Sequence, residues 1–101
     1  MTESDLLTGV LDIARVTGWW AMRVRQGRTA HGRRATASGN GVGFPDLLAV
    51  RGDRIVVAEL KIGWRALTDE QRAWLAAFAT VSVEAHVWRD TDYPDTIAGA
   101  L

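Results

Sequence analysis

The stretch PDLLAVRGDRIVVAELK, residues Pro45–Lys61, consists of two apolar segments joined by Gly52-Asp53. A two-residue turn at this dipeptide predicts an antiparallel hairpin with strands over 46–50 and 55–62. If the pairing continues from the turn, Asp46 lies opposite Glu59, and directly opposed residues have Cβ atoms roughly 4.5–5.5 Å apart. Lys61 follows Glu59 on the same face of the strand. The hairpin therefore brings two carboxylates and a lysine together at its open end.

Outside the hairpin, residues 2–16 predict an amphipathic helix, because their apolar residues recur three and four positions apart. Thr2 and Asp5 form its capping pair. A second helix is predicted over 68–79, where Thr68 and Gln71 fit a capping box. Strands are expected over 19–24 and 81–88, and a short helix over 91–101. We expect the apolar residues of two elements to face inward: Leu67, Ala73, Trp74, Ala77 and Phe78 for the second helix, and Val81, Val83, Ala85 and Val87 for the last strand.

These elements predict one α/β (α+β) domain over residues 1–101, with a small mixed sheet flanked by helices in the order α-β-β-β-α-β-α. The chain has no cysteine, which excludes disulfides and thiolate metal sites. Its longest apolar run, residues 73–79, is too short to span a membrane. Its acidic start, Met-Thr-Glu-Ser-Asp, is the reverse of a signal peptide, so a cytoplasmic protein is expected.

The charges are unevenly distributed along the chain. The net charge is zero, yet residues 13–45 contain six arginines and no acid. Five glycines fall in 26–44, so a mobile basic loop is expected there. Such a loop is either a solvated connector or an arm that contacts phosphates. The zero net charge therefore does not exclude a nucleic-acid partner.

The acids of the hairpin point to metal chemistry. Two adjacent carboxylates repel each other unless a cation lies between them, and an all-oxygen site suits Mg²⁺ or Mn²⁺. Such an ion activates water and stabilises charge on a phosphate, and a nearby ammonium assists both. The simpler interpretation is a surface Glu–Lys pair. The preceding Pro-Asp, the hairpin register and the fact that Lys61 is the only lysine in the chain favour a functional site.

Gly43-Phe44-Pro45-Asp46, then Glu59-Leu60-Lys61, then Gln71 on the next helix, together resemble the motifs of the PD-(D/E)XK nuclease superfamily. The order and spacing are most similar to its VRR-NUC branch, which pairs Pro-Asp and Glu-X-Lys with a glutamine on the following helix. Val87-Trp88-Arg89, at the last strand, is also typical of the C-terminal part of these domains. The resemblance covers the whole chain. Phe44 departs from it, because a small residue is frequent at that position.

The resemblance implies a restriction-endonuclease-like fold and a metal-dependent phosphodiesterase. By position, Asp46 and Glu59 would bind Mg²⁺ or Mn²⁺ together with the backbone carbonyl of Leu60. Lys61 would position the attacking water, and Gln71 would hold the water or the phosphate. Gln71 is alternatively only a capping residue. An acid on the first helix often completes such a site, and the candidates are Glu3, then Asp5 and Asp12; Glu3 alternatively only complements the helix dipole.

The resemblance also implies DNA as the partner and no small-molecule cofactor. Stand-alone members of the family are often phage-encoded and cut branched or junction DNA, and cutting two strands is easiest for a homodimer. The basic residues expected to contact DNA are Arg25, Arg28, Arg33, Arg34 and Arg65. We expect Trp64 to pack locally rather than stack on a base, and give His86 no role. The alternatives are a non-catalytic nucleic-acid-binding module that uses the Arg-rich loop, and an interaction domain that binds a partner through exposed tryptophans.

Overall fold

A computed structural model describes residues 1–24 and 39–101. Its elements follow the predicted order. They are α1 (Glu3–Val16), β1 (Trp20–Arg23), β2 (Leu47–Arg51), β3 (Arg54–Lys61), α2 (Asp69–Phe78), β4 (Glu84–Arg89) and α3 (Asp95–Ala100), with a 3-10 turn, η1, at Asp90–Asp92. The basic loop predicted over 26–44 lies mostly outside the described residues. Within the two described ranges, no helix is long and apolar enough to cross a membrane.

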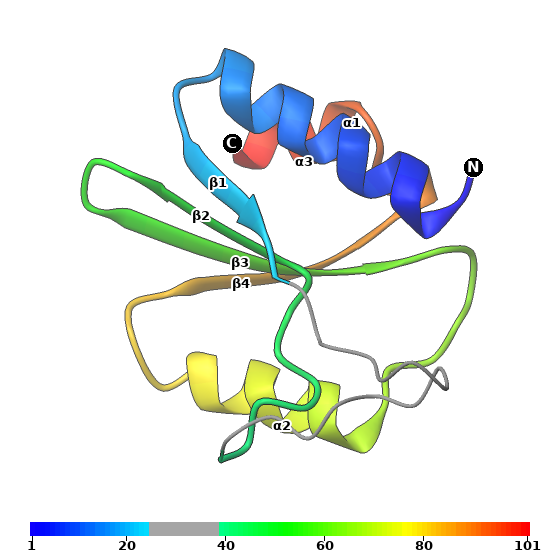
Figure 1. Ribbon diagram of the computed structural model, residues 1–101, viewed down its shortest axis with the longest axis vertical. Helices are drawn as coiled ribbons and strands as arrows, with labels where there is room; N and C mark the ends of the chain where they lie inside the picture. The colour runs from blue at the N-terminus through cyan, green and yellow to red at the C-terminus, as the bar shows by residue number, and fades with distance from the viewer. Residues whose placement is uncertain (25–38) are drawn as a thin grey trace, which may run out of the picture.

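The strands form one four-stranded mixed sheet in the order β1-β2-β3-β4. β1, β2 and β3 are antiparallel neighbours, and β4 runs parallel to β3. Figure 1 shows α1 and α3 on one side of the sheet and α2 on the other. This arrangement confirms the predicted fold class and is consistent with a restriction-endonuclease-like fold.

The hairpin of β2 and β3 has the register that the two-residue turn predicts. Arg51 pairs with Arg54, and the ladder continues to Leu47 opposite Ala58. The turn requires a positive backbone angle, and Gly52 adopts it with φ of 61°. Register matters here because a slip of one residue would move every side chain to the other face of the sheet. The turn thus fixes which face carries the charged residues.

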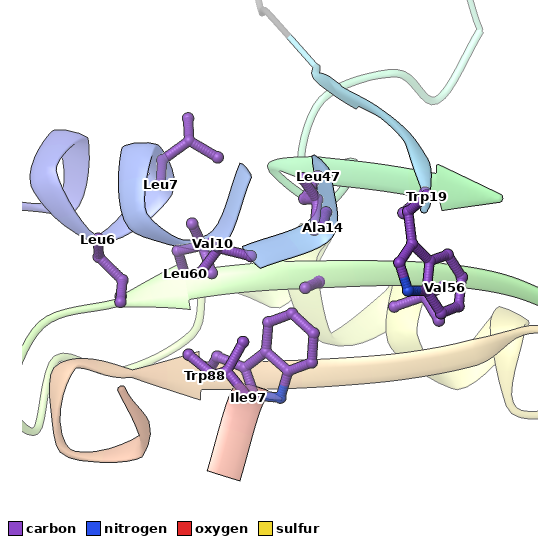
Figure 2. Packing of buried hydrophobic residues seen from close by; sticks show 12 residues of the cluster. Leu6, Leu7, Val10, Ala14, Trp19, Leu47, Val56, Leu60, Trp88 and Ile97 are labelled. Atoms are coloured by element: carbon purple, nitrogen blue, oxygen red, sulfur yellow. The ribbon is translucent and has the colours of Figure 1, made fainter. Parts of the chain in front are cut away.

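The core lies between α1, α3 and the face of the sheet beneath them. Leu6, Val10 and Ala14 of α1 are fully buried and belong to one cluster with Leu60 and Trp88 of the sheet (Figure 2). Thr2 and Asp5 begin α1 with the predicted capping box. Since alternate residues of a strand face opposite sides, Glu59 and Lys61 of β3 are directed away from this core, toward the α2 side.

The predicted inward face of the last strand is wrong. β4 begins at Glu84 rather than at residue 81, and Val81 is 57% exposed. Parallel pairing sets Leu60 beside Trp88 and Ala58 beside His86, so the even-numbered residues of β4 face the α1 core. His86 stacks on Trp88 there, with ring centroids 4.9 Å apart. The long-range pairing with β3, not the apolar alternation, sets the faces of this strand.

The predicted buried face of α2 is also not buried. No residue of α2 is buried, and Ala73 and Ala77 are exposed. Instead, Phe44 packs edge-on against Trp74 and Phe78, with ring centroids 4.9 and 5.8 Å away. Phe44, which departs from the family pattern, therefore packs the loop before β2 against α2, and the Asn40 carbonyl of the same loop accepts a hydrogen bond from Trp74 Nε1 at 2.7 Å.

Candidate active site

Two charged side chains are buried among the described residues, and both belong to the Glu-X-Lys motif. Glu59 is 3% exposed and Lys61 is 7% exposed. The ladder of the hairpin ends at Leu47, one residue after Asp46. There the Asp46 side chain crosses to the neighbouring strand, and its Oδ2 accepts a hydrogen bond from the Leu60 amide at 2.8 Å. Asp46, Glu59 and Lys61 thus lie together at the open end of the hairpin.

The environment of Glu59 strongly favours its protonated form. Burial contributes most, and the hydrogen bond and negative charge of Asp46 add to it, raising the pKa of Glu59 to about 8. Glu3 contributes further repulsion, and the positive charge of Lys61 only partly offsets these effects. At neutral pH without a bound cation, Glu59 therefore holds a proton that a positive ion could replace.

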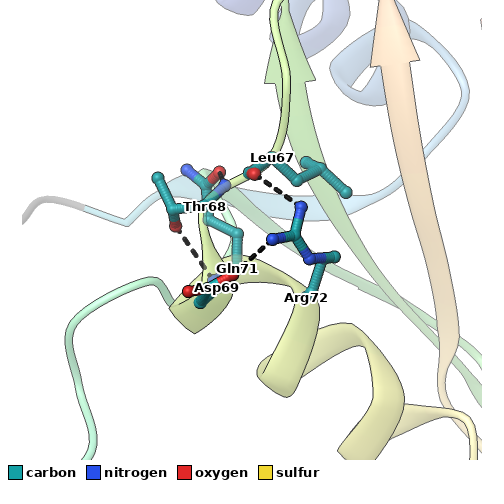
Figure 3. A network of polar contacts seen from close by, with 5 residues as sticks. All are labelled: Leu67, Thr68, Asp69, Gln71 and Arg72. Carbon is teal, nitrogen blue, oxygen red and sulfur yellow. Dashed lines mark hydrogen bonds and ion pairs between the residues drawn. The ribbon is translucent and has the colours of Figure 1, made fainter.

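Gln71 connects α2 to this carboxylate. Its Oε1 accepts a hydrogen bond from the Thr68 amide at 2.8 Å, which completes the capping box drawn in Figure 3. Its Nε2 donates to Glu59 Oε1 at 3.0 Å. The two interpretations of Gln71 are therefore compatible, because one end of the amide caps the helix while the other contacts Glu59.

Gly43 brings the start of α2 close to the hairpin. It has a φ of 86°, and a Cβ at this position would lie 2.6 Å from Glu70 Cβ and 2.9 Å from the Gln71 amide nitrogen. No side chain fits at that separation without moving α2. The glycine of the motif is therefore what allows Gln71 to reach Glu59.

We expect Gly43→Ala to destabilise the fold and to displace Gln71 from Glu59. A matched control is Gly52→Ala, because Gly52 also has a positive φ but a Cβ there would meet nothing within 4 Å. The left-handed conformation costs both variants about 1–2 kcal/mol, and the clash adds to this at residue 43 alone. Denaturant unfolding measures the stability, and the side-chain amide NMR signal of Gln71 reports its contact. Equal losses in the two variants, with an unchanged Gln71 signal, would contradict this role.

Glu3 and Arg23 extend the site toward α1. They line a pocket of about 370 Å³ together with Asp46 and Leu60. Among the three candidate acids of the first helix, Glu3 is the one that lines this pocket. Asp5 instead accepts the Thr2 amide at 3.0 Å, and this hydrogen bond lowers the pKa of Asp5. Asp12 is exposed on α1.

Arg23 is a site residue that the sequence did not reveal. Arg23 is the last residue of β1 and pairs with Leu47, the residue after Asp46. Knowledge of this strand pairing would have identified Arg23 as a neighbour of Asp46. That pairing joins strands separated by a long segment, so no local turn predicts it. Arg23 adds a positive charge to a pocket that otherwise contains two carboxylates.

The remaining predicted residues lie in two places. Arg65 is exposed beside the site, with Nη1 3.6 Å from Glu3 Oε2. Trp64 is 96% exposed, so the expectation that it packs locally is wrong. Four predicted DNA contacts lie outside the described residues: Arg25, Arg28, Arg33 and Arg34.

The described residues contain no group of three or more His, Cys, Asp and Glu side chains gathered closely enough to hold a metal ion. Asp46 and Glu59 nevertheless fit an oxygen-preferring divalent cation, because they are adjacent carboxylates and Glu59 is buried with a raised pKa. The donor chemistry of this pair is thus compatible with the expected Mg²⁺ or Mn²⁺.

Comparison with known proteins found a distant likeness. No family model and no curated protein matches the chain. Among solved structures, the chain is similar to Hjc, a Holliday junction resolvase from the archaeal hyperthermophile Archaeoglobus fulgidus, with 22% identity and a TM-score of 0.45. The match covers 87% of this chain and 65% of the archaeal protein. This chain therefore corresponds to only part of the length of that protein.

Proposed function

We propose that the protein is a metal-dependent endonuclease of the VRR-NUC type that hydrolyses DNA phosphodiester bonds. One observation carries the proposal: Asp46, Glu59 and Lys61 lie together at the end of the hairpin, with both ionisable side chains of the Glu-X-Lys motif buried. Burying a carboxylate and an ammonium costs free energy unless each is compensated. A Glu–Lys pair with only a structural role would be more stable exposed to water than buried beside a second carboxylate.

Asp46 and Glu59 are the residues that would hold Mg²⁺ or Mn²⁺, together with the Leu60 carbonyl. Glu3 lines the pocket beside Asp46 and Leu60, and its charge acts on Glu59. When bound, such an ion supplies Lewis acidity and lowers the pKa of a coordinated water. Gln71 holds one oxygen of Glu59, which fixes the orientation of that carboxylate. Fixing a ligand in this way reduces the reorganisation needed during the reaction.

Lys61 would orient the attacking water and stabilise the negative charge that develops on the phosphate. Its ammonium is on the same face as Glu59, two residues further along β3. Arg23 in the pocket and Arg65 at its rim provide further positive charges for the DNA backbone. Arginine suits this task because its guanidinium matches phosphate oxygens in a bidentate geometry.

We expect Lys61→Ala to reduce cleavage by about 10²–10⁴-fold. The substrates are linear duplex, fork and four-way junction DNA, each incubated with Mg²⁺, Mn²⁺ or EDTA. The control is Arg15→Ala, which removes an exposed positive charge from the last turn of α1, at the opposite end of that helix from Glu3. It should leave cleavage unchanged.

Cleavage that EDTA and Lys61→Ala both abolish supports the nuclease. Binding to DNA without cleavage of any substrate in either metal would instead support the non-catalytic module. Faster cutting of the junction than of the duplex supports the structure-selective part of the proposal. Equal rates on all three substrates would leave a nuclease but reject that preference.

The proposal includes a homodimer, since one chain offers one site and two strands must be cut. The α2-side face of the sheet offers apolar surface for it. Trp20 is 85% exposed and pairs with Val50, which pairs with Ile55, so these three partly or fully exposed residues form one cross-strand row. Sedimentation velocity with and without DNA measures the stoichiometry.

A further inference from the structure

The loop that follows Lys61 presents an indole ring to solvent. Trp64 lies three residues beyond Lys61, between the end of β3 and the start of α2, and is 96% exposed. Tryptophan is highly buried on average, because its large apolar surface is costly to leave in water. Such exposure beside a buried charged site therefore needs an explanation.

The backbone on both sides of Trp64 is held in place by the last residue of β4 and the first residue of η1. Arg89 Nη1 donates to the carbonyl of Gly63 at 2.9 Å and to the carbonyl of Arg65 at 2.9 Å. The Gly63 amide donates to Asp90 Oδ1, also at 2.9 Å. One guanidinium thus bridges the residues that flank Trp64. The indole is carried on a fixed backbone rather than on a loose connector.

Charged residues lie next to Trp64 in the loop and at the nearby pocket. Arg65 follows it directly and lies 3.6 Å from Glu3, which lines the pocket beside Asp46. A site for an apolar protein partner would be expected to contain several apolar residues around the tryptophan. An aromatic ring beside an arginine at the rim of a phosphate-directed site instead matches the way single-stranded nucleic acid is bound, by base stacking and backbone contacts.

We propose that Trp64 stacks on an unpaired DNA base next to the phosphate to be cut, with Arg65 contacting the adjoining phosphate. This inference rests on the proposed function and names its substrate class as DNA with unpaired bases at a branch or end. A base in a continuous duplex is already stacked on both faces and cannot offer one to the indole. The clamp from Arg89 and Asp90 keeps the ring in position before DNA binds, which lowers the cost of ordering it.

The test measures binding in EDTA, so that no substrate is cut. A fork with unpaired thymines at the branch is compared with a fully paired duplex of equal length. Trp64→Ala should weaken binding to the fork by roughly 5–100-fold, the range expected for one lost stacked base. Binding to the duplex should change little. Trp64→Phe should restore much of the affinity, whereas Trp64→Leu, which is apolar but not aromatic, should not.

A second measurement shows which base of the DNA contacts Trp64. A 2-aminopurine base at the branch should lose fluorescence on binding the wild-type protein, and not on binding Trp64→Ala. Because the side chain is exposed, the variants should unfold at the wild-type denaturant midpoint. Wild-type affinity of Trp64→Ala for the fork, or an equal loss on fork and duplex, overturns the stacking contact and leaves the nuclease intact. A wild-type protein that neither binds nor cuts any DNA overturns both proposals.

Discussion

Glu59→Gln is expected to stabilise the metal-free protein at alkaline pH while it removes metal-dependent cleavage. The folded protein raises the pKa of Glu59 to about 8, from an ordinary 4.5, mainly through burial and then through Asp46. Between these two values the folded state binds a proton that the unfolded state has lost, so stability falls as pH rises through this window. Glutamine resembles the protonated acid but does not titrate, so the variant should not lose stability as the pH rises through this window. Each pKa unit of this difference corresponds to about 1.4 kcal/mol, so at pH 9 the gain should amount to several kcal/mol.

Urea unfolding in EDTA at pH 5 and pH 9 measures this difference, which should be small at pH 5 and larger at pH 9. The control is Glu84→Gln. A two-point hydrogen bond from Arg54, at 2.7 Å for both contacts, lowers the pKa of Glu84. That glutamate contributes stability above its ordinary pKa, so its replacement should destabilise the protein at pH 9. A Glu59→Gln variant less stable than wild type at pH 9 would contradict the raised pKa.

The part of the site that the sequence predicts is the part that local structure determines. A two-residue turn admits one register, so the side of the sheet on which Glu59 and Lys61 lie follows from the position of Gly52 alone. The capping box likewise placed Gln71 at the start of a helix. The family resemblance implied only that Gln71 would hold the water or the phosphate. Its contact with Glu59 was not predicted, and it is the structure that brings the two side chains within hydrogen-bonding distance.

The parts that the sequence did not predict depend on long-range packing. Arg23 reaches the pocket because β1 pairs with β2, and these two strands are far apart in the sequence. The faces of β4 are set by parallel pairing with β3, and both faces of that strand are partly covered, so alternation could not distinguish them. For α2, periodicity identified an apolar stripe but not what covers it. Phe44, from the loop before β2, takes much of that place.

The affinity for Mn²⁺ is expected to rise with pH and to level off above about pH 8. A cation that binds between Asp46 and Glu59 must displace the proton held by Glu59, whose pKa is raised to about 8. Below that value each pH unit should cost about 10-fold in apparent affinity, or about 100-fold from pH 8 to pH 6. An ordinary glutamate would have released its proton near pH 4.5, and the affinity would then be flat over this range.

Isothermal titration calorimetry in buffers of different ionisation enthalpy separates metal binding from proton release. Near pH 7 about one proton should be released per ion bound, and close to none above pH 9. Glu59→Gln should bind Mn²⁺ weakly and release no proton at either pH, whereas Glu84→Gln, which is remote from the hairpin end, should behave as wild type. Proton release that persists in Glu59→Gln would assign the displaced proton to another group. If the affinity of wild type proves flat between pH 6 and pH 8, Glu59 does not hold a proton in the metal-free site, and burial of this carboxylate must be compensated by its protein neighbours alone.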